Sequence, residues 1–182
     1  VGAALVSHPD VAGVAFTGST EVAKSIQRTL AAKDGPIVPL IAETGGQNAM
    51  IIDSSALPEQ VVDDVVLSAF GSAGQRCSAP RVLFVQEDVA DKILEMLKGA
   101  MAELAVSDPD QLSSDIGPVI DEDALEVLEK HRARLEKFGK KIYEVPLAEG
   151  LKNKGHFFAP CAYEINSLAD LEREVFGPVL HV

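Results

Sequence analysis

The chain has 182 residues, of which 47% are apolar and 24% are charged, a balance typical of globular proteins and unlike disordered or collagenous ones. Its 28 Asp and Glu outnumber its 16 Lys and Arg, giving a net charge of −12. Nucleic acids and anionic membrane surfaces are bound by basic faces, so this charge argues against both as partners. No apolar run approaches the ~18 residues of a membrane span, so we expect no membrane insertion.

The cysteines and histidines indicate neither a disulfide scaffold nor a metal site. The two cysteines, Cys77 and Cys161, lack CxxC spacing, which favours a reducing, cytoplasmic setting. The four histidines show no metal-ligand spacing, and most of them are expected at the surface or in strands. We therefore expect no metal ion.

Apolar runs alternate with helical patterns, which predicts an α/β protein. Strands are expected at residues 11–16, 39–42, 48–52, 82–85, 157–165 and 179–182. Helices are expected from Ser19 or Thr20 to about Leu30, from Pro58, from Asp88, and from a cap at Asp121 to a C-terminal glycine at Gly139. A domain boundary is expected near Gly45.

The two ends indicate a piece of a longer protein. The chain begins at Val1 without methionine and stops within the strand-like residues 179–182. The strand at residues 11–16 then lacks sheet neighbours, so we expect the piece to self-associate through an apolar edge.

Cys77 is the first candidate for chemistry. It follows Gly74 and Arg76 in a segment of small residues, and a thiolate becomes nucleophilic beside positive charge or a helix terminus. The alternative is a small buried apolar residue, and Cys161, between Pro160 and Ala162, fits that alternative well.

Two further segments carry weaker signals. Glu43 ends an apolar strand before two glycines, where a carboxylate can act as a general base or simply be solvated. Residues 17–20 join a strand to a helix, the geometry of either a phosphate site or an ordinary helix cap.

The order of the motifs is more specific than any one of them. Residues 16–20 (Phe-Thr-Gly-Ser-Thr), 43–46 (Glu-Thr-Gly-Gly), 74–77 (Gly-Gln-Arg-Cys) and 174–179 (Glu-Val-Phe-Gly-Pro-Val) resemble motifs of the aldehyde dehydrogenase superfamily in order and spacing. The resemblance implies an α/β aldehyde dehydrogenase-like fold. It places the end of a Rossmann-type NAD-binding domain at residues 1–44 and most of the catalytic domain at residues 45–182.

Within the superfamily, residues 41–50 and 72–79 resemble the L-glutamate γ-semialdehyde (1-pyrroline-5-carboxylate) dehydrogenase modules of bifunctional bacterial proline utilization proteins. Glu-Thr-Gly-Gly-Gln stands here where most of the superfamily has Glu-Leu-Gly-Gly-Lys, which favours this subfamily. The implied reaction is NAD-dependent oxidation of the semialdehyde to L-glutamate. In such proteins FAD would serve only a separate proline dehydrogenase domain.

The resemblance also implies roles for individual residues. Cys77 would be the nucleophile and Glu43 the base that activates water. Cofactor contacts are implied for Thr17, Gly18, Ser19, Val22, Glu174 and Phe176. Substrate contacts are implied for Arg76 and Ser78.

The expected partner is a small-molecule substrate, in a protein that is a homo-oligomer, cytoplasmic or peripheral at the inner membrane. Three alternatives stay open: a dehydrogenase for another semialdehyde, a cofactor-independent thiol acyltransferase or esterase, and a module that keeps the fold without the chemistry. The motif at residues 174–177, which has no role without a nicotinamide ribose, argues against the second. The presence of Cys77 and Glu43 argues against the third.

Overall fold

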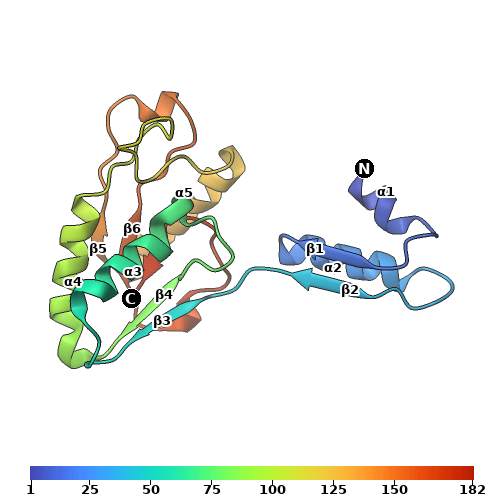
Figure 1. Ribbon diagram of the computed structural model, residues 1–182, viewed down its shortest axis with the longest axis horizontal. Helices are drawn as coiled ribbons and strands as arrows, with labels where there is room; N and C mark the ends of the chain where they lie inside the picture. Colours follow the sequence, from blue (N-terminus) through green and yellow to red (C-terminus); the bar gives the residue numbers. More distant parts are fainter. The chain divides into compact units, whose positions relative to one another are not determined.

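The computed structural model describes the backbone of all 182 residues and every side chain except that of Lys152. The chain divides into two compact units, Val1–Gly46 and Gln47–Val182 (Figure 1). None of the helices in the described part of the chain is both long enough and apolar enough to cross a membrane.

The first unit is a β-α-β arrangement preceded by a short helix. Its elements are α1 (Gly2–Ser7), β1 (Val14–Thr17), α2 (Thr20–Ala31) and β2 (Leu40–Glu43). The strands β1 and β2 pair in parallel, with Thr17 opposite Glu43. As predicted, Ser19 caps α2, since its Oγ accepts a hydrogen bond from the Val22 N–H at 3.3 Å.

The second unit is built on a five-stranded mixed sheet in the order β3-β4-β7-β6-β5. The strands are β3 (Ala49–Ile52), β4 (Val82–Val85), β5 (Lys140–Glu144), β6 (Cys161–Glu164) and β7 (Val179–His181). The first four in sheet order are parallel, and β5 runs antiparallel to β6. The last strand of the sequence therefore lies in the middle of the sheet.

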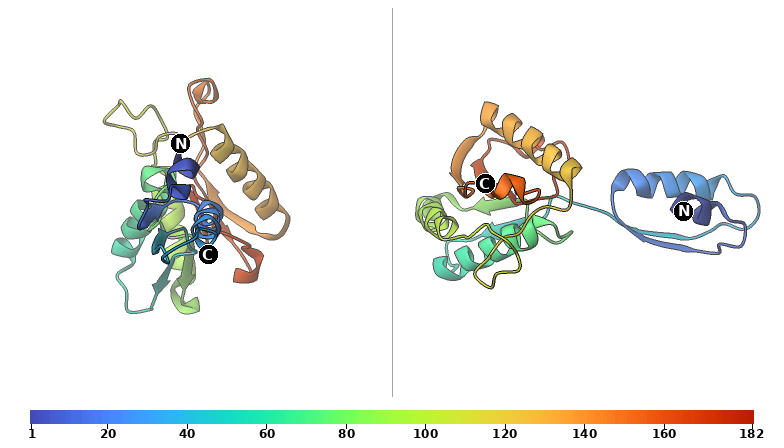
Figure 2. Two further views of the ribbon diagram at one scale, coloured as in Figure 1. Left: turned by 90° about the vertical axis from the view of Figure 1, so that its right-hand side faces the viewer. Right: turned by 90° about the horizontal axis from the view of Figure 1, so that it is seen from above.

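Helices cover both faces of this sheet. They are α3 (Pro58–Phe70), α4 (Glu87–Ala102) and α5 (Glu122–Phe138), with short 3-10 turns η1 (Gly71–Gly74), η2 (Leu151–Asn153) and η3 (Leu168–Asp170). Both views of Figure 2 show α3 and α4 on one face and α5 on the other. The inner strands β6 and β7 are thereby covered on both faces, whereas the edge strand β3 leaves Ile51 78% exposed.

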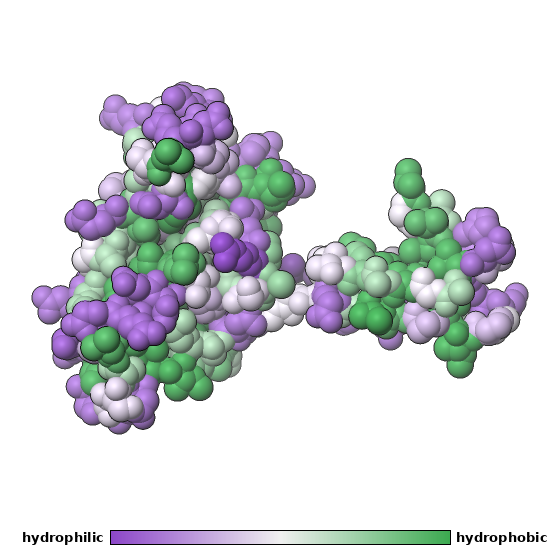
Figure 3. All heavy atoms as spheres, viewed as in Figure 1, coloured by the Kyte–Doolittle hydropathy of each residue, from purple (hydrophilic) through white to green (hydrophobic). Residues whose placement is uncertain are grey.

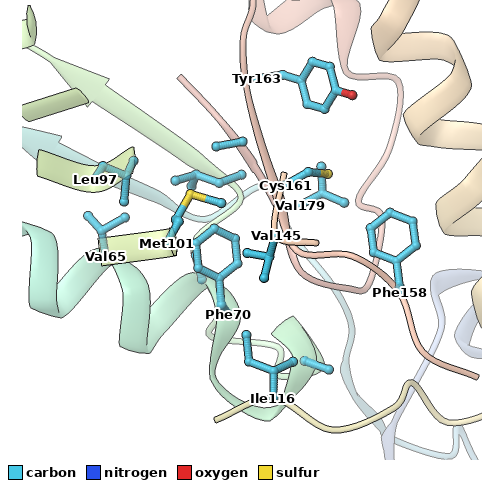
Figure 4. Packing of buried hydrophobic residues seen from close by; sticks show 14 of the residues in the cluster. Val65, Phe70, Leu97, Met101, Ile116, Val145, Phe158, Cys161, Tyr163 and Val179 are labelled. Atoms are coloured by element: carbon cyan, nitrogen blue, oxygen red, sulfur yellow. The ribbon is translucent and has the colours of Figure 1, made fainter. Parts of the chain in front are cut away.

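The core of the second unit lies between the sheet and these helices (Figure 4). Phe70, Leu97, Met101 and Cys161 are fully buried in it. The apolar face of α3 contributes Val61, Val65, Ala69 and Phe70 to this core. Burial of this face, at about 25 cal/mol per Å² of apolar surface, is what holds α3 against its neighbours.

Local signals placed the helix starts correctly. Pro58 is the first residue of α3, and Asp121 caps α5 by accepting the Ala124 N–H at 2.8 Å. Gly139 follows the last residue of α5, as predicted, but not in the left-handed conformation typical of a C-terminal glycine. Its backbone is extended, with φ −90°. Packing at this position is close, because a Cβ would lie 3.1 Å from the Leu135 carbonyl oxygen and 3.3 Å from the Glu164 carbonyl oxygen.

Two predictions of strands need correction. The strand expected at residues 157–165 is regular only at Cys161–Glu164, because Pro160 and the buried pair Phe157 and Phe158 precede it. The strand β5, directly after Gly139, was not predicted, since its Lys-Lys-Ile-Tyr-Glu sequence is mostly polar. It forms because antiparallel pairing with β6 satisfies its backbone at the edge of the sheet.

Candidate active site

Three loops meet at one edge of the second unit's sheet. Asn48 directly precedes β3, the Cys77 segment precedes β4, and residues 174–178 precede β7. Because β3, β4 and β7 are adjacent parallel strands, their amino ends lie at the same edge. The sheet topology thus brings together two predicted motifs that are about a hundred residues apart in the sequence.

The segment before Cys77 has an unusual backbone. Ser72, Ala73 and Gly74 have φ values of 56°, 53° and 63°, three left-handed residues in a row. For residues with a Cβ this conformation costs on the order of 1 kcal/mol or more each, so surrounding contacts must hold it. At Gly74 a Cβ would collide with the Gly177 carbonyl, so only glycine fits between the two loops.

Cys77 itself presents an exposed thiol at the end of this segment. Its backbone carbonyl accepts a hydrogen bond from Asn48 Nδ2 at 2.5 Å, and the same Nδ2 donates to the Ala79 carbonyl at 3.1 Å. In the described structure the backbone N–H of Cys77 has no protein acceptor. An exposed thiol beside a free N–H has the arrangement needed to attack a carbonyl and hold the oxygen that becomes negative.

The two candidate substrate residues flank Cys77. The Arg76 guanidinium bonds back to Ser72 Oγ at 3.1 and 3.0 Å, which ties it to the left-handed segment. Ser78 is exposed. Both side chains are therefore at the surface around the thiol.

Arg81 lies beneath the Cys77 loop and is 1% exposed. All five of its N–H groups donate hydrogen bonds. Nε and Nη2 each donate to Glu174 Oε1, at 3.2 and 3.1 Å. Nη1 donates to the Gly74 and Gly177 carbonyls at 2.7 and 3.0 Å, and the second N–H of Nη2 donates to the Arg76 carbonyl at 3.2 Å. Burial lowers the pKa of Arg81, and the bonds to Glu174 oppose that shift. The buried charge is thus fully hydrogen-bonded and paired.

Glu174 and Phe176 stand on the other side of Arg81. The Glu174 side chain is 14% exposed and takes both hydrogen bonds on one oxygen, which leaves Oε2 without a partner among the described residues. The Arg81 guanidinium lies 5.2 Å from the centre of the Phe176 ring, which is 44% exposed. A carboxylate oxygen and an apolar ring are therefore available to a ligand at this edge.

A buried histidine pair supports the backbone of Arg81. His181 on β7 approaches the Arg81 carbonyl through its backbone N–H at 2.9 Å and its Nδ1 at 2.7 Å. Its Nε2 lies 2.9 Å from His131 Nε2. Since a carbonyl only accepts, His181 carries its proton on Nδ1 and receives a hydrogen bond from the Nε2–H of His131.

The expectation for His131 was wrong, because it is a core residue of α5 and 6% exposed. It shares the inward face of α5 with Leu128 and Leu135, at the helical spacing of a core position. Burial lowers the pKa of both His131 and His181 to about 4. Both rings are therefore neutral near pH 7.

The first unit holds the remaining candidates. Thr17 ends β1 and Glu43 ends β2, side by side and exposed. The Gly18 N–H donates to the Glu43 carbonyl at 3.1 Å, so this group is already engaged. Val22, in the first turn of α2, is 48% exposed.

The second cysteine is unsuited to chemistry. Cys161 is fully buried opposite Val179, and burial raises the pKa of its thiol. Its interpretation as a buried apolar residue is confirmed. Cys77 is therefore the thiol accessible to a substrate.

A cavity of about 430 Å³ lies away from this edge, beside β5 and α5. Its charged lining residues are Arg132, Glu129 and Glu144, and Arg132 pairs with both glutamates. None of the predicted site residues lines it. The chemistry therefore does not coincide with this cavity.

Comparison with known proteins agrees with the motifs. The sequence pattern of the aldehyde dehydrogenase family matches residues 1–182. The chain belongs to this family. It is 53% identical over its whole length to the bifunctional protein PutA of Klebsiella aerogenes, but it spans only 14% of that relative.

Solved structures of the family have the same fold. A crystal structure of Bradyrhizobium japonicum proline utilization A superposes with a TM-score of 0.94 at 59% identity, covering all of this chain and 18% of that one. A 1-pyrroline-5-carboxylate dehydrogenase from Thermus with bound NAD gives a TM-score of 0.90 at 30% identity, covering all of this chain and 35% of that one. These likenesses confirm the predicted aldehyde dehydrogenase fold.

Three features of this aldehyde dehydrogenase chain escaped the sequence reasoning: Asn48 as a brace, Arg81 as a buried hub, and the His131–His181 pair. Arg81 follows a proline and opens an apolar strand, so a buried charge in need of a partner was the available signal. Nothing local indicated that its partner would be Glu174.

Proposed function

We propose that this chain carries the nucleophile and the ribose-binding carboxylate of an NAD-dependent dehydrogenase that oxidises L-glutamate γ-semialdehyde to L-glutamate. The observation that supports it most is the exposed Cys77 thiol, with a free backbone N–H, on a loop joined through Arg81 to Glu174. The names of the PutA and 1-pyrroline-5-carboxylate dehydrogenase relatives support the substrate. The chain spans 14% and 35% of those two relatives, so the whole protein's activity is part of the proposal.

The residues present suit a nicotinamide cofactor. Glu174 Oε2 can accept hydrogen bonds from ribose hydroxyls, and Phe176 offers an apolar surface. In the first unit, the start of α2 at Ser19 provides a helix dipole for the pyrophosphate. We assign the first unit to the end of the NAD-binding domain and the second unit to the catalytic domain.

The chemistry divides between Cys77 and Glu43. The Cys77 sulfur bonds to the aldehyde carbon, and the carbonyl oxygen takes the electron pair and is held by the Cys77 N–H. NAD, when bound, supplies the acceptor for the hydride that leaves this carbon, and a thioester to Cys77 results.

Glu43 then takes a proton from water, whose oxygen attacks the thioester carbon. The carbon–sulfur bond breaks, so that glutamate leaves and the Cys77 thiolate is restored.

Replacement of the thiol tests the nucleophile. In the natural full-length protein, Cys77→Ala should lower NADH formation from the semialdehyde by at least about a thousandfold, while NAD affinity stays within a few-fold. Cys161→Ala is the matched control and should retain activity at a temperature where it is folded. Substantial turnover by Cys77→Ala, or an equal loss in the control, would remove Cys77 from the reaction.

Replacement of the carboxylate separates the half-reactions. With Glu43→Gln we expect a burst of about one NADH per site followed by a stall at the acyl-enzyme, because only thioester hydrolysis needs the base. Rapid-quench sampling and mass spectrometry of the Cys77 peptide measure both. A missing burst would place Glu43 in activating the thiol instead, and unchanged steady-state turnover would exclude it from catalysis.

A further inference from the structure

We propose that Arg81 is a positioning residue that fixes the Cys77 loop and the Glu174 carboxylate relative to each other, so that nucleophile and cofactor are placed by one buried group. The inference rests on the proposed function for the roles of Cys77 and Glu174. Arg81 touches neither the substrate nor the cofactor in this scheme, and it acts through the groups it holds.

Arg81 first constrains the loop that carries the thiol. Its Nη1 and Nη2 donate to the carbonyls of Gly74 and Arg76, one before and one after Gln75. These bonds hold the end of the left-handed segment and the residue joined directly to Cys77. The direction of the Cys77 N–H thus depends on where the guanidinium lies.

The same side chain constrains the second loop. Nη1 also donates to the Gly177 carbonyl, and Nε and Nη2 converge on Glu174 Oε1. Because both of these bonds fall on one oxygen, the carboxylate is held in orientation while Oε2 stays free to accept from a ligand. Gly74 packs directly on Gly177, so the two loops are in contact as well as bridged.

Only arginine provides this arrangement. Five donors in a planar fork reach three carbonyls and a carboxylate from one buried position, whereas lysine has three donors on one nitrogen. Phe176 stacks against the guanidinium and closes it from one side. His181 makes no hydrogen bond to the Arg81 guanidinium. It holds the backbone of Arg81 instead, by hydrogen bonds to the Arg81 carbonyl oxygen.

The inference predicts that two separable properties depend on Arg81. One is NAD affinity, measured by calorimetry. The other is hydrolysis of p-nitrophenyl acetate without NAD, in which the Cys77 thiolate takes the acetyl group, p-nitrophenolate leaves, and water releases acetate. A residue that served only to fold the protein would lower neither property once the variant is folded.

The test uses the natural full-length protein with Arg81→Met and Arg81→Lys. We expect Arg81→Met to weaken NAD binding and to slow ester hydrolysis, each by at least tenfold, and Arg81→Lys to recover part of both. Arg132→Met is the matched control, since Arg132 is a partly buried arginine paired with Glu129 and Glu144 and stacked on Phe158. It should leave both properties within twofold. Folding is monitored by circular dichroism. If Arg81→Met does not fold, the NAD affinity and ester hydrolysis of Arg81→Lys are used to test the inference.

A double-variant cycle sharpens the result. Glu174→Gln keeps an oxygen for Arg81 and changes the group offered to the ribose, so it should weaken NAD binding alone. If Arg81 acts through Glu174, the Arg81→Met, Glu174→Gln double variant should bind NAD no more than threefold more weakly than Arg81→Met.

The inference would be overturned by a folded Arg81→Met or Arg81→Lys variant with both properties within twofold of the natural protein, by fully additive effects in the cycle, or by equal losses in Arg132→Met. Failure of the proposed function gives a different result, because Cys77→Ala would then retain ester hydrolysis and NADH formation.

Discussion

The two units of the chain differ in how much apolar surface each encloses. In Val1–Gly46 the buried side chains are those of Ala23 and Leu30, while Ile37 and Ile41 are 98% and 64% exposed. Apolar atoms accordingly lie on the surface of this unit (Figure 3). Gln47–Val182 instead closes a continuous core between three helices and five strands.

The two units therefore differ in how much burial of apolar side chains contributes to their stability. A two-stranded parallel sheet with one helix leaves one face open, and such small sheets are marginal in water. The first unit therefore gains little stability from the burial of its own apolar residues. The second unit has helices packed on both sides of its sheet. Within it, loss of any hydrogen-bond partner of Arg81 would be destabilising, because the charge of Arg81 is buried.

The largest expected effect comes from separating the units. Residues 47–182 made alone should unfold in one cooperative urea transition, whereas residues 1–46 alone should show none, because two buried side chains cannot offset the loss of chain entropy. Far-UV circular dichroism of the two polypeptides measures this. A cooperative transition in residues 1–46 would show that the comparison is wrong.

The same substitution in each unit should have unequal effects. Leu97→Ala, at a fully buried position of α4, should lower the free energy of unfolding of the 182-residue chain by about 3 to 5 kcal/mol. Leu30→Ala, at a position with few buried neighbours, should cost no more than about 2 kcal/mol, the low end for such a truncation. Urea titrations compare them, and equal losses would mean that the first unit has a core of comparable quality.

The third expected effect is a pH dependence confined to the second unit. His131 and His181 have pKa values lowered from 6.5 to about 4 by burial, so the unfolded chain binds more protons than the folded one between these pH values. Stability should therefore fall as pH drops from 6.5 to 4, by up to about 5 kcal/mol.

Carboxylates also titrate in this pH range, so histidine variants are needed to separate the two contributions to stability. His131→Gln is made in the polypeptide spanning residues 47–182, and His8→Gln in the whole chain. His131→Gln removes one titrating group and keeps an N–H for His181, so the loss of stability should shrink by about half. His8→Gln, at an exposed position of the first unit, should leave the pH dependence unchanged. An undiminished loss in His131→Gln would contradict the assigned cause.

Local sequence signals determined much of this protein. Ser19, Pro58 and Asp121 start helices because a capping oxygen or a fixed φ acts on backbone groups within three residues. Apolar runs likewise predicted β3 and β4, since short apolar runs rich in Val and Ile and bounded by turn residues are typical of strands. The motifs around Cys77 and Glu174 identified the family before any contact was known.

Tertiary structure alone decided which of these segments meet. The place of β7 between β4 and β6 brings Glu174 to Arg81, and it brings His181 to His131 on α5. No residue near Arg81 in the sequence can signal a partner 93 positions away, because a buried charge is satisfied by whatever group the sheet order places within hydrogen-bond distance. The sequence by itself named the candidate reacting groups, and long-range packing decided how the segment that carries Cys77 is held.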